Sequence, residues 1–280
     1  MAGQRVLITG AAGGVGTILR RGLANEGWII RGYDLVIPEG AADETPEGAR
    51  ETEWIQADLA DTDRLAEAMR DVDAVIHLAG IPGERDFAAI RTANIDGTHH
   101  VFEAAHQAAV PRVIYASSNH AVGFHDRDDF AGEPAGVDIR PRPDTFYGVS
   151  KVFGEALGSY YADRHGLQVV CVRIGSCFED IKSVRMLETW LSPADAVRLF
   201  HALLTAPDVR FEVVYGISAN TRGWMDLGPA RRLGYEPRDD AERFRDEVER
   251  KFGELDADDP EYRFLGGRFT TFGPNRGESR

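Results

Sequence analysis

Short apolar runs alternate with amphipathic segments along the first two thirds of the chain. The runs cover residues 5–9, 28–30, 54–57, 74–79, 112–116 and 167–174. Segments with the helical spacing of apolar residues lie between these runs. The first ends near residues 25–27, and the others span 61–70, 87–110 and 147–166. The run at 74–79 is almost wholly apolar, as in a strand covered on both faces. Uninterrupted strand–helix alternation predicts an α/β fold, a doubly wound parallel sheet.

A glycine-rich turn joins the first predicted strand to the first helix. It contains Gly10, Gly13, Gly14, Val15 and Gly16. Glycines at this place let backbone N–H groups approach a pyrophosphate at the helix N-terminus, as in Rossmann-type folds.

Asp34 ends the second predicted strand, 18 residues after Gly16. A carboxylate there would accept hydrogen bonds from the adenosine ribose and repel a 2′-phosphate. NAD is therefore the expected cofactor, in preference to NADP.

The pattern loosens after Gly175. A polar loop leads to an apolar piece at 186–191, a helix opened by Ser192 and Pro193, a strand at 211–216 and a charged remainder. We expect an NAD-binding domain at 1–175 that carries the catalytic residues. A small substrate-binding subdomain at 176–280 is expected to pack closely on it.

The net charge and composition indicate which classes of molecule the protein is expected to bind. The chain is 43% hydrophobic and 28% charged, with a net charge of −14, which disfavours nucleic acid and anionic membrane surfaces. An anionic small molecule would need a local basic group. Only Cys171 and Cys177 are present, and there is neither a leader pattern nor a membrane-length apolar run, so we expect a cytoplasmic protein.

Polar side chains gather at predicted strand ends, where open α/β sheets bind ligands. Asp58 ends the third strand and residues 117–120 follow the fifth. Tyr147 and Lys151 stand four positions apart at the start of a helix, so they share one face. A nearby ammonium would lower the tyrosine pKa toward neutrality and make Tyr147 a base. The adjacent histidines 99 and 100 point in different directions on a helix, and no metal site is expected.

The motifs at 9–16, 58–59, 77–80, 94, 117–118 and 147–151 resemble, in this order, the extended short-chain dehydrogenase/reductase family. The resemblance implies that Ser118 and Tyr147 contact the reacting oxygen, Lys151 holds the nicotinamide ribose, and Asn94 anchors a proton-relay water. It implies cofactor contacts from a larger set: Gly10, Gly13, Gly14, Val15, Gly16, Asp34, Asp58, Leu59, Leu78, Ala79, Gly80, Asn94, Tyr147, Lys151 and Ile174.

A closer likeness, at 116–120, 173–177, 185–190 and 216–220, is to a branch of this family that oxidises C1 of uronic acids to lactones with NAD. By that resemblance Arg185 grips the substrate carboxylate, and a bidentate guanidinium suits the task. The implied hydroxyl-binding residues are Ser118, Asn119, His120, Tyr147 and Ser176. The branch has a further hydroxyl-binding serine where this chain reads Ile81-Pro82-Gly83.

Other activities remain open from the sequence. A neutral aldose 1-dehydrogenase and a nucleotide-sugar epimerase or dehydratase share the same motifs. A non-catalytic NAD-sensing protein is disfavoured, because such proteins tend to lose the tyrosine or the lysine. The resemblance also implies a homo-oligomer, paired through the helices that begin near Phe87 and Tyr147.

Overall fold

A parallel sheet runs through the centre of the protein, in a computed structural model that describes residues 3–41, 52–254 and 256–272. The strand order is β3-β2-β1-β4-β5-β6-β9, and every neighbouring pair is parallel. The strands are β1 (Arg5–Thr9), β2 (Ile29–Asp34), β3 (Glu53–Gln56), β4 (Ala74–His77), β5 (Arg112–Ser118), β6 (Gln168–Ile174) and β9 (Phe211–Gly216). The predicted doubly wound α/β fold is confirmed.

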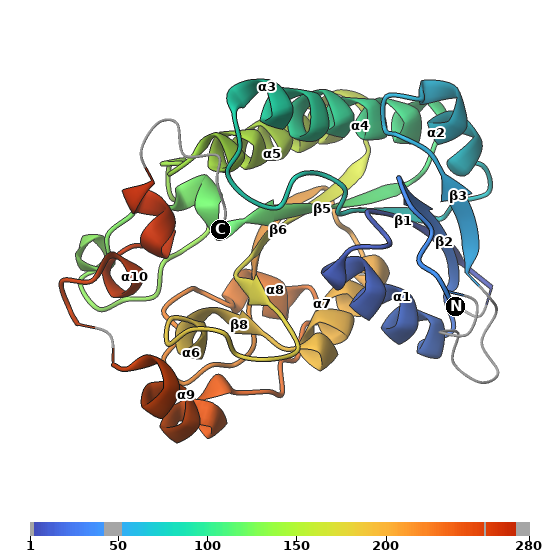
Figure 1. Cartoon of the computed structure of the whole chain (residues 1–280). Helices are drawn as coiled ribbons and strands as arrows, with labels where there is room; N and C mark the ends of the chain where they lie inside the picture. The colour runs from blue at the N-terminus through green and yellow to red at the C-terminus, as the bar shows by residue number, and fades with distance from the viewer. Residues whose placement is uncertain (1–2, 42–51, 255, 273–280) are drawn as a thin grey trace.

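Helices cover both faces of this sheet (Figure 1). One layer contains α1 (Gly14–Asn25), α7 (Pro193–Thr205) and α8 (Gly228–Arg232). The other contains α2 (Thr62–Ala68), α4 (Gly97–Gln107) and α5 (Phe146–His165). Because strand side chains alternate, Val6 and Ile8 of β1 enter the first core while Leu7 enters the second, which explains the continuous apolar runs.

The helix expected over 87–110 is modified at its start. It begins as α3 (Phe87–Ile90), passes through a π-helical turn at Arg91–Asp96 and continues as α4, which ends at Gln107. A π turn accommodates one extra residue and shifts the helical faces before and after it relative to each other. Asn94 lies inside this turn and is buried.

The C-terminal third both completes the sheet and extends beyond it. The strand expected at 211–216 within the subdomain is β9, which pairs with β6 from Val169↔Phe211 to Ile174↔Gly216. It covers the edge of β6, while α7 packs on α1. The remaining elements are β7 (Ser176–Cys177), α6 (Met186–Thr189), β8 (Trp190–Leu191), α9 (Arg245–Phe252) and α10 (Pro260–Arg263). The division of the chain at residue 175 stays a prediction.

Candidate active site

The glycine turn places backbone close to backbone at the carboxyl end of β1. Gly10 has φ +74°, and a Cβ there would lie 2.7 Å from the amide nitrogen of Ala79. A Cβ at Gly16 would lie 2.2 Å from the carbonyl oxygen of Gly10. Helix α1 begins without a side-chain cap and without an acid in its first turn. Its leading N–H groups therefore fit a pyrophosphate, as NAD requires.

Asp34 lies beside this turn, at the end of β2. Its carboxylate accepts hydrogen bonds from the backbone N–H of Ala12 at 2.9 Å and of Leu35 at 2.7 Å. The residue expected to bind ribose thus also braces the glycine turn. The other residues expected to contact the cofactor follow neighbouring strands: Asp58 and Leu59 follow β3, Leu78, Ala79 and Gly80 follow β4, and Ile174 ends β6. They lie at the same edge of the sheet.

The N-terminus of α5 is fixed from two sides, and this positions Tyr147. The hydroxyl of Thr145 accepts a hydrogen bond from the N–H of Gly148 at 3.0 Å. The Glu84 carboxylate accepts from the N–H groups of Phe146 at 3.2 Å and Tyr147 at 2.9 Å. A Cβ at Gly154 would lie 2.2 Å from the Tyr115 ring, so glycine lets α5 lie directly against β5.

Lys151 extends across this contact. Its ammonium donates to the carbonyl oxygen of Ala116 at 2.7 Å and lies 5.3 Å from the Tyr147 ring centre. Burial lowers the pKa of Lys151 to about 8, and the Glu155 carboxylate opposes this shift. Glu155 is itself held by Arg173 at 2.8 Å and by the Ser117 hydroxyl at 2.6 Å.

The pKa of Tyr147 differs from the sequence expectation. It is raised to about 12, because the phenolate would be desolvated and because Asp144 adds negative charge nearby. A hydrogen bond with Ser118 works in the opposite direction. The expected lowering of this pKa was wrong for the protein alone, because the penalty of burying the phenolate is the largest effect on it.

Asn94 connects the loop after β4 to α5. Its Oδ1 accepts from the N–H of Ile81 at 2.7 Å, and its Nδ2 donates to the Ile81 carbonyl at 3.0 Å and to the Ser150 hydroxyl at 3.2 Å. The Ser150 hydroxyl in turn donates to the carbonyl of Tyr147 at 2.6 Å. The π turn therefore aims the buried amide at the helix that carries the tyrosine.

The residues expected to bind substrate come from the turn after β5 and from the segment around α6. Asn119 and His120 follow Ser118 in a 3₁₀ turn, and the His120 ring centre lies 5.7 Å from that of Tyr147. The short parallel pair β7–β8 brackets α6, which brings Ser176 to within 2.9 Å of the Thr189 hydroxyl. Arg185 stands at the N-cap position of α6 without a capping hydrogen bond from its side chain.

Arg185 and Asn119 meet at one carbonyl group. The Asn119 amide donates to the Leu265 carbonyl at 2.5 Å, and the Arg185 guanidinium donates to the same oxygen. Burial lowers the pKa of Arg185, while the charges of Glu188, Glu261 and Asp144 raise it. Arg185 is thus a partly buried cation whose side chain has one hydrogen-bond partner, Leu265, among the described residues. Its other guanidinium donors are available to a ligand.

Several contacts in this region had no sequence signal. Leu265 and Phe269 come from the C-terminal segment, and Phe269 stacks on His120 with ring centres 4.1 Å apart. Asp144 binds His120 from the residue before the cap of α5. Glu155 is the exception, because its position four residues after Lys151 on a helix could have indicated the interaction.

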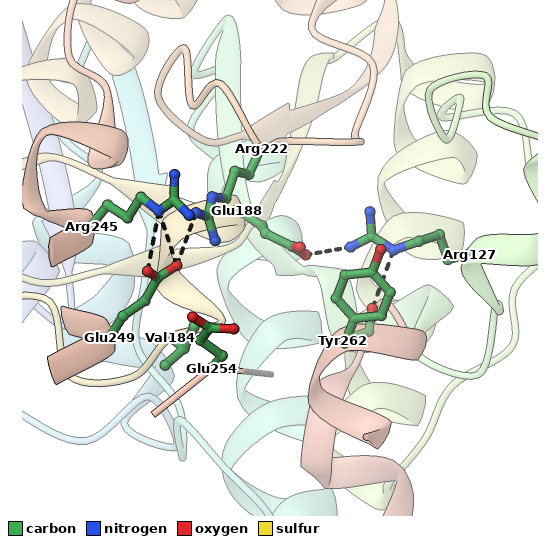
Figure 2. Close-up of a pocket in the computed structure, with 8 residues that line it drawn as sticks. All are labelled: Arg127, Val184, Glu188, Arg222, Arg245, Glu249, Glu254 and Tyr262. Atoms are coloured by element: carbon green, nitrogen blue, oxygen red, sulfur yellow. Dashed lines mark hydrogen bonds and ion pairs between the residues drawn. The ribbon is translucent and has the colours of Figure 1, made fainter. Parts of the chain in front are cut away.

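A separate cavity of about 370 Å³ lies between α6, α9 and α10 (Figure 2). It is lined by Arg127, Val184, Glu188, Arg222, Arg245, Glu249, Glu254 and Tyr262. Glu188 pairs with Arg127 at 2.6 Å and Glu249 with Arg222 at 2.9 Å. None of the predicted site residues lines it, and its charged groups largely bind one another.

Among residues 3–41, 52–254 and 256–272, no cluster of His, Cys, Asp and Glu side chains could hold a metal ion. No helix in this part of the chain has the length and apolarity needed to cross a membrane.

Known proteins resemble this chain over nearly its whole length. Residues 6–178 match the NAD dependent epimerase/dehydratase family. A uronate dehydrogenase of Pseudomonas syringae is 41% identical, with 97% of this chain and 94% of that protein covered. An NAD-dependent glucose-6-phosphate dehydrogenase of Haloferax volcanii is 39% identical, with coverage of 86% and 95%.

A solved structure, a variant of uronate dehydrogenase from Agrobacterium tumefaciens complexed with NAD, superposes with a TM-score of 0.87 at 38% identity. The superposition covers 96% of this chain and 98% of that one. The predicted family and cofactor are confirmed. The chain therefore belongs to the NAD dependent epimerase/dehydratase family and is an NAD-dependent dehydrogenase that acts on a CH–OH group.

Proposed function

We propose that this protein oxidises C1 of a cyclic uronic acid, galacturonate or glucuronate, to the aldarolactone. The observation that carries the proposal is that the 118–120 segment contacts both groups, Tyr147 and Arg185. The His120 ring lies 5.7 Å from the Tyr147 ring, and Asn119 shares the Leu265 carbonyl with Arg185. A sugar bound between them would present its carboxylate to the guanidinium and its C1 hydroxyl to the tyrosine. The likeness to uronate dehydrogenases supports the same substrate.

The reaction removes a proton from the C1 hydroxyl and a hydride from C1. Tyr147, as phenolate, accepts the proton, while the Ser118 hydroxyl hydrogen-bonds the same oxygen. NAD supplies the hydride acceptor and a positively charged ring when bound. Lys151 holds the ribose and favours the phenolate, and Asn94 anchors the water through which the proton leaves. Because C1 of the cyclic sugar already bears the ring oxygen, its oxidation gives a lactone.

The protein's own residues account for cofactor selection. The glycine turn at 10–16 would hold the pyrophosphate, and Asp34 would accept from the ribose hydroxyls. The carboxylate would repel the 2′-phosphate of NADP. Asp58, Leu59, Leu78, Ala79, Gly80 and Ile174 would line the rest of the cofactor at the carboxyl edge of the sheet.

The test is NADH formation at 340 nm with galacturonate, glucuronate, arabinose, galactose and glucose 6-phosphate. We expect turnover of the uronates. In Arg185→Ala, KM for the uronates should rise about 100-fold, since one buried charge-assisted pair contributes about 2–3 kcal/mol. The low turnover of neutral aldoses should stay unchanged. Equal use of neutral aldoses, with no effect of the substitution, would refute the carboxylate assignment.

A second candidate, oxidation of a phosphorylated aldose, is favoured by the Haloferax relative alone. It uses the same Tyr147 chemistry with a larger dianion at Arg185. Preference for glucose 6-phosphate over both uronates in the assay would select it. We further propose that the protein is cytoplasmic and homo-oligomeric, as expected from its cysteine usage and its resemblance.

A further inference from the structure

Asp144 occupies a space that three glycines keep open. The side chain is fully buried, and its carboxylate Oδ2 would clash with a Cβ at Gly123, at 2.0 Å, or at Gly266, at 1.8 Å. A Cβ at Gly148 would lie 3.1 Å from Oδ1. Gly123 and Gly266 are joined over the carboxylate by a backbone hydrogen bond of 2.9 Å. Three separate segments thus enclose one negative charge.

The carboxylate has two hydrogen-bond partners among the described residues. Oδ1 accepts from the Thr145 hydroxyl at 2.8 Å, and Oδ2 lies 2.7 Å from Nδ1 of His120. A carboxylate can only accept, so Nδ1 of His120 must carry the proton. In the neutral ring Nε2 is then an acceptor, and no described residue binds it.

The His120 ring is held on its other sides as well. Phe269 stacks on it at 4.1 Å between ring centres with an interplanar angle of 22°, and the Tyr147 ring approaches edge-on at 5.7 Å. The side chain of His120 is only 13% exposed, so it has little freedom to rotate. Its unbound nitrogen therefore has a defined position next to the tyrosine.

We propose that Asp144 is a positioning residue that fixes the tautomer and orientation of His120, so that Nε2 accepts a hydrogen bond from a sugar hydroxyl. The inference rests on the proposed function, because it assumes a hydroxylated substrate beside Tyr147. A carboxylate that orients a histidine and fixes its tautomer is a general device in proteins. Here it would make the site selective for a hydrogen-bond donor at that position of the sugar.

The test compares Asp144→Asn with Asp138→Asn, a change of an exposed carboxylate in the loop that precedes it. The nitrogen-15 chemical shifts of the His120 ring report its tautomer in the protein without substrate. The His120 signals are identified as those that disappear in His120→Gln. We expect the Nδ1–H form to dominate in the native chain and in Asp138→Asn. In Asp144→Asn a substantial share should shift to Nε2–H, because the amide can donate to Nδ1.

Kinetics then test the consequence for binding. Asp144→Asn should raise KM for the preferred uronate about 10- to 100-fold with a smaller change in kcat, by analogy with residues that orient a metal-binding histidine. In a protein that already carries His120→Gln, the Asp144→Asn change should raise KM by less than about twofold further, because both substitutions remove the same interaction with the sugar. An unchanged tautomer, or an undiminished effect of Asp144→Asn in that background, would overturn the proposal. The tautomer is measured without substrate, so failure of the uronate assignment would appear in the turnover panel instead.

Discussion

Lys151 is proposed to act in the reaction, but burying its charge destabilises the folded protein. Its ammonium is buried between α5 and β5 and has a single hydrogen bond, to the Ala116 carbonyl, among the described residues. Burial lowers its pKa from 10.5 to about 8, which means that the folded protein disfavours the charged form that the ribose contact uses. The charged form of Tyr147 is disfavoured in the same way, because burial of the phenolate raises its pKa to about 12.

Lys151→Met should therefore abolish dehydrogenase activity yet stabilise the protein at pH 7. Loss of the buried charge is favourable by on the order of 2 kcal/mol after the lost hydrogen bond is subtracted, which raises Tm by a few degrees. Wild-type stability should rise as the pH passes from about 8 toward 10.5, since the unfolded chain then holds a proton that the folded protein has released. The advantage of the variant should shrink over that interval in calorimetric scans. A variant less stable than wild type at pH 7 would contradict this account.

At the scale of elements, the π turn at Arg91–Asp96 decides where Asn94 points. An unbroken α-helix from Phe87 would rotate the residues before the turn by about 100° relative to those after it. The buried amide could not then bind Ile81 on one side and Ser150 on the other while α3 stays against α5. The spacing of apolar residues predicts the helix but not the π turn, because one extra residue in a turn changes that spacing only slightly.

Deletion of Thr92, an exposed residue in the π turn, should restore the α register. We expect dehydrogenase activity to fall at least about tenfold, since misplacing a group by an ångström or more has effects of this size or greater. Helix content by circular dichroism should be kept. Thr92→Ala retains the chain length and should leave activity unchanged. Full activity of the deletion variant would show that the π turn does not position Asn94.

At the scale of the whole molecule, an apolar stripe on α5 stays exposed in the described part of the chain. Phe146, Val149 and Tyr160 are 39%, 41% and 54% exposed, and the exposed Phe87 packs against Phe146 at 5.4 Å between ring centres. Val149 and Tyr160 are eleven residues apart and therefore share one helix face. Exposed aromatic and β-branched side chains in a row are typical of an interface.

We predict that a second copy of the chain covers this stripe. The double change Val149→Glu and Tyr160→Glu should reduce the mass measured by light scattering to that of the 30.8 kDa monomer. Phe252→Glu alters a similarly exposed apolar side chain on α9 and should leave the mass unchanged. A native protein that is already monomeric at micromolar concentration would refute the interface.

Much of this architecture follows from local sequence. Strands buried on both faces need continuous apolar runs, so β1, β4, β5 and β6 are visible in the sequence. The glycine turn and the Tyr147–Lys151 spacing are short-range patterns with a direct steric or helical cause. The C-terminal strand β9 was found as a strand, but its place in the central sheet was not, because pairing with β6 is a long-range contact that its own residues do not encode.

The sequence by itself determined the fold class, the cofactor, the family and the residues proposed for the chemistry. Only the tertiary structure decided how those residues are held and charged. Burial reverses the expected direction of the Tyr147 pKa, Leu265 joins Asn119 to Arg185, and three glycines make room for Asp144 beside His120. The physical reason is that desolvation and close packing depend on atoms contributed by segments more than a hundred residues apart, whereas motifs record only neighbours along the chain.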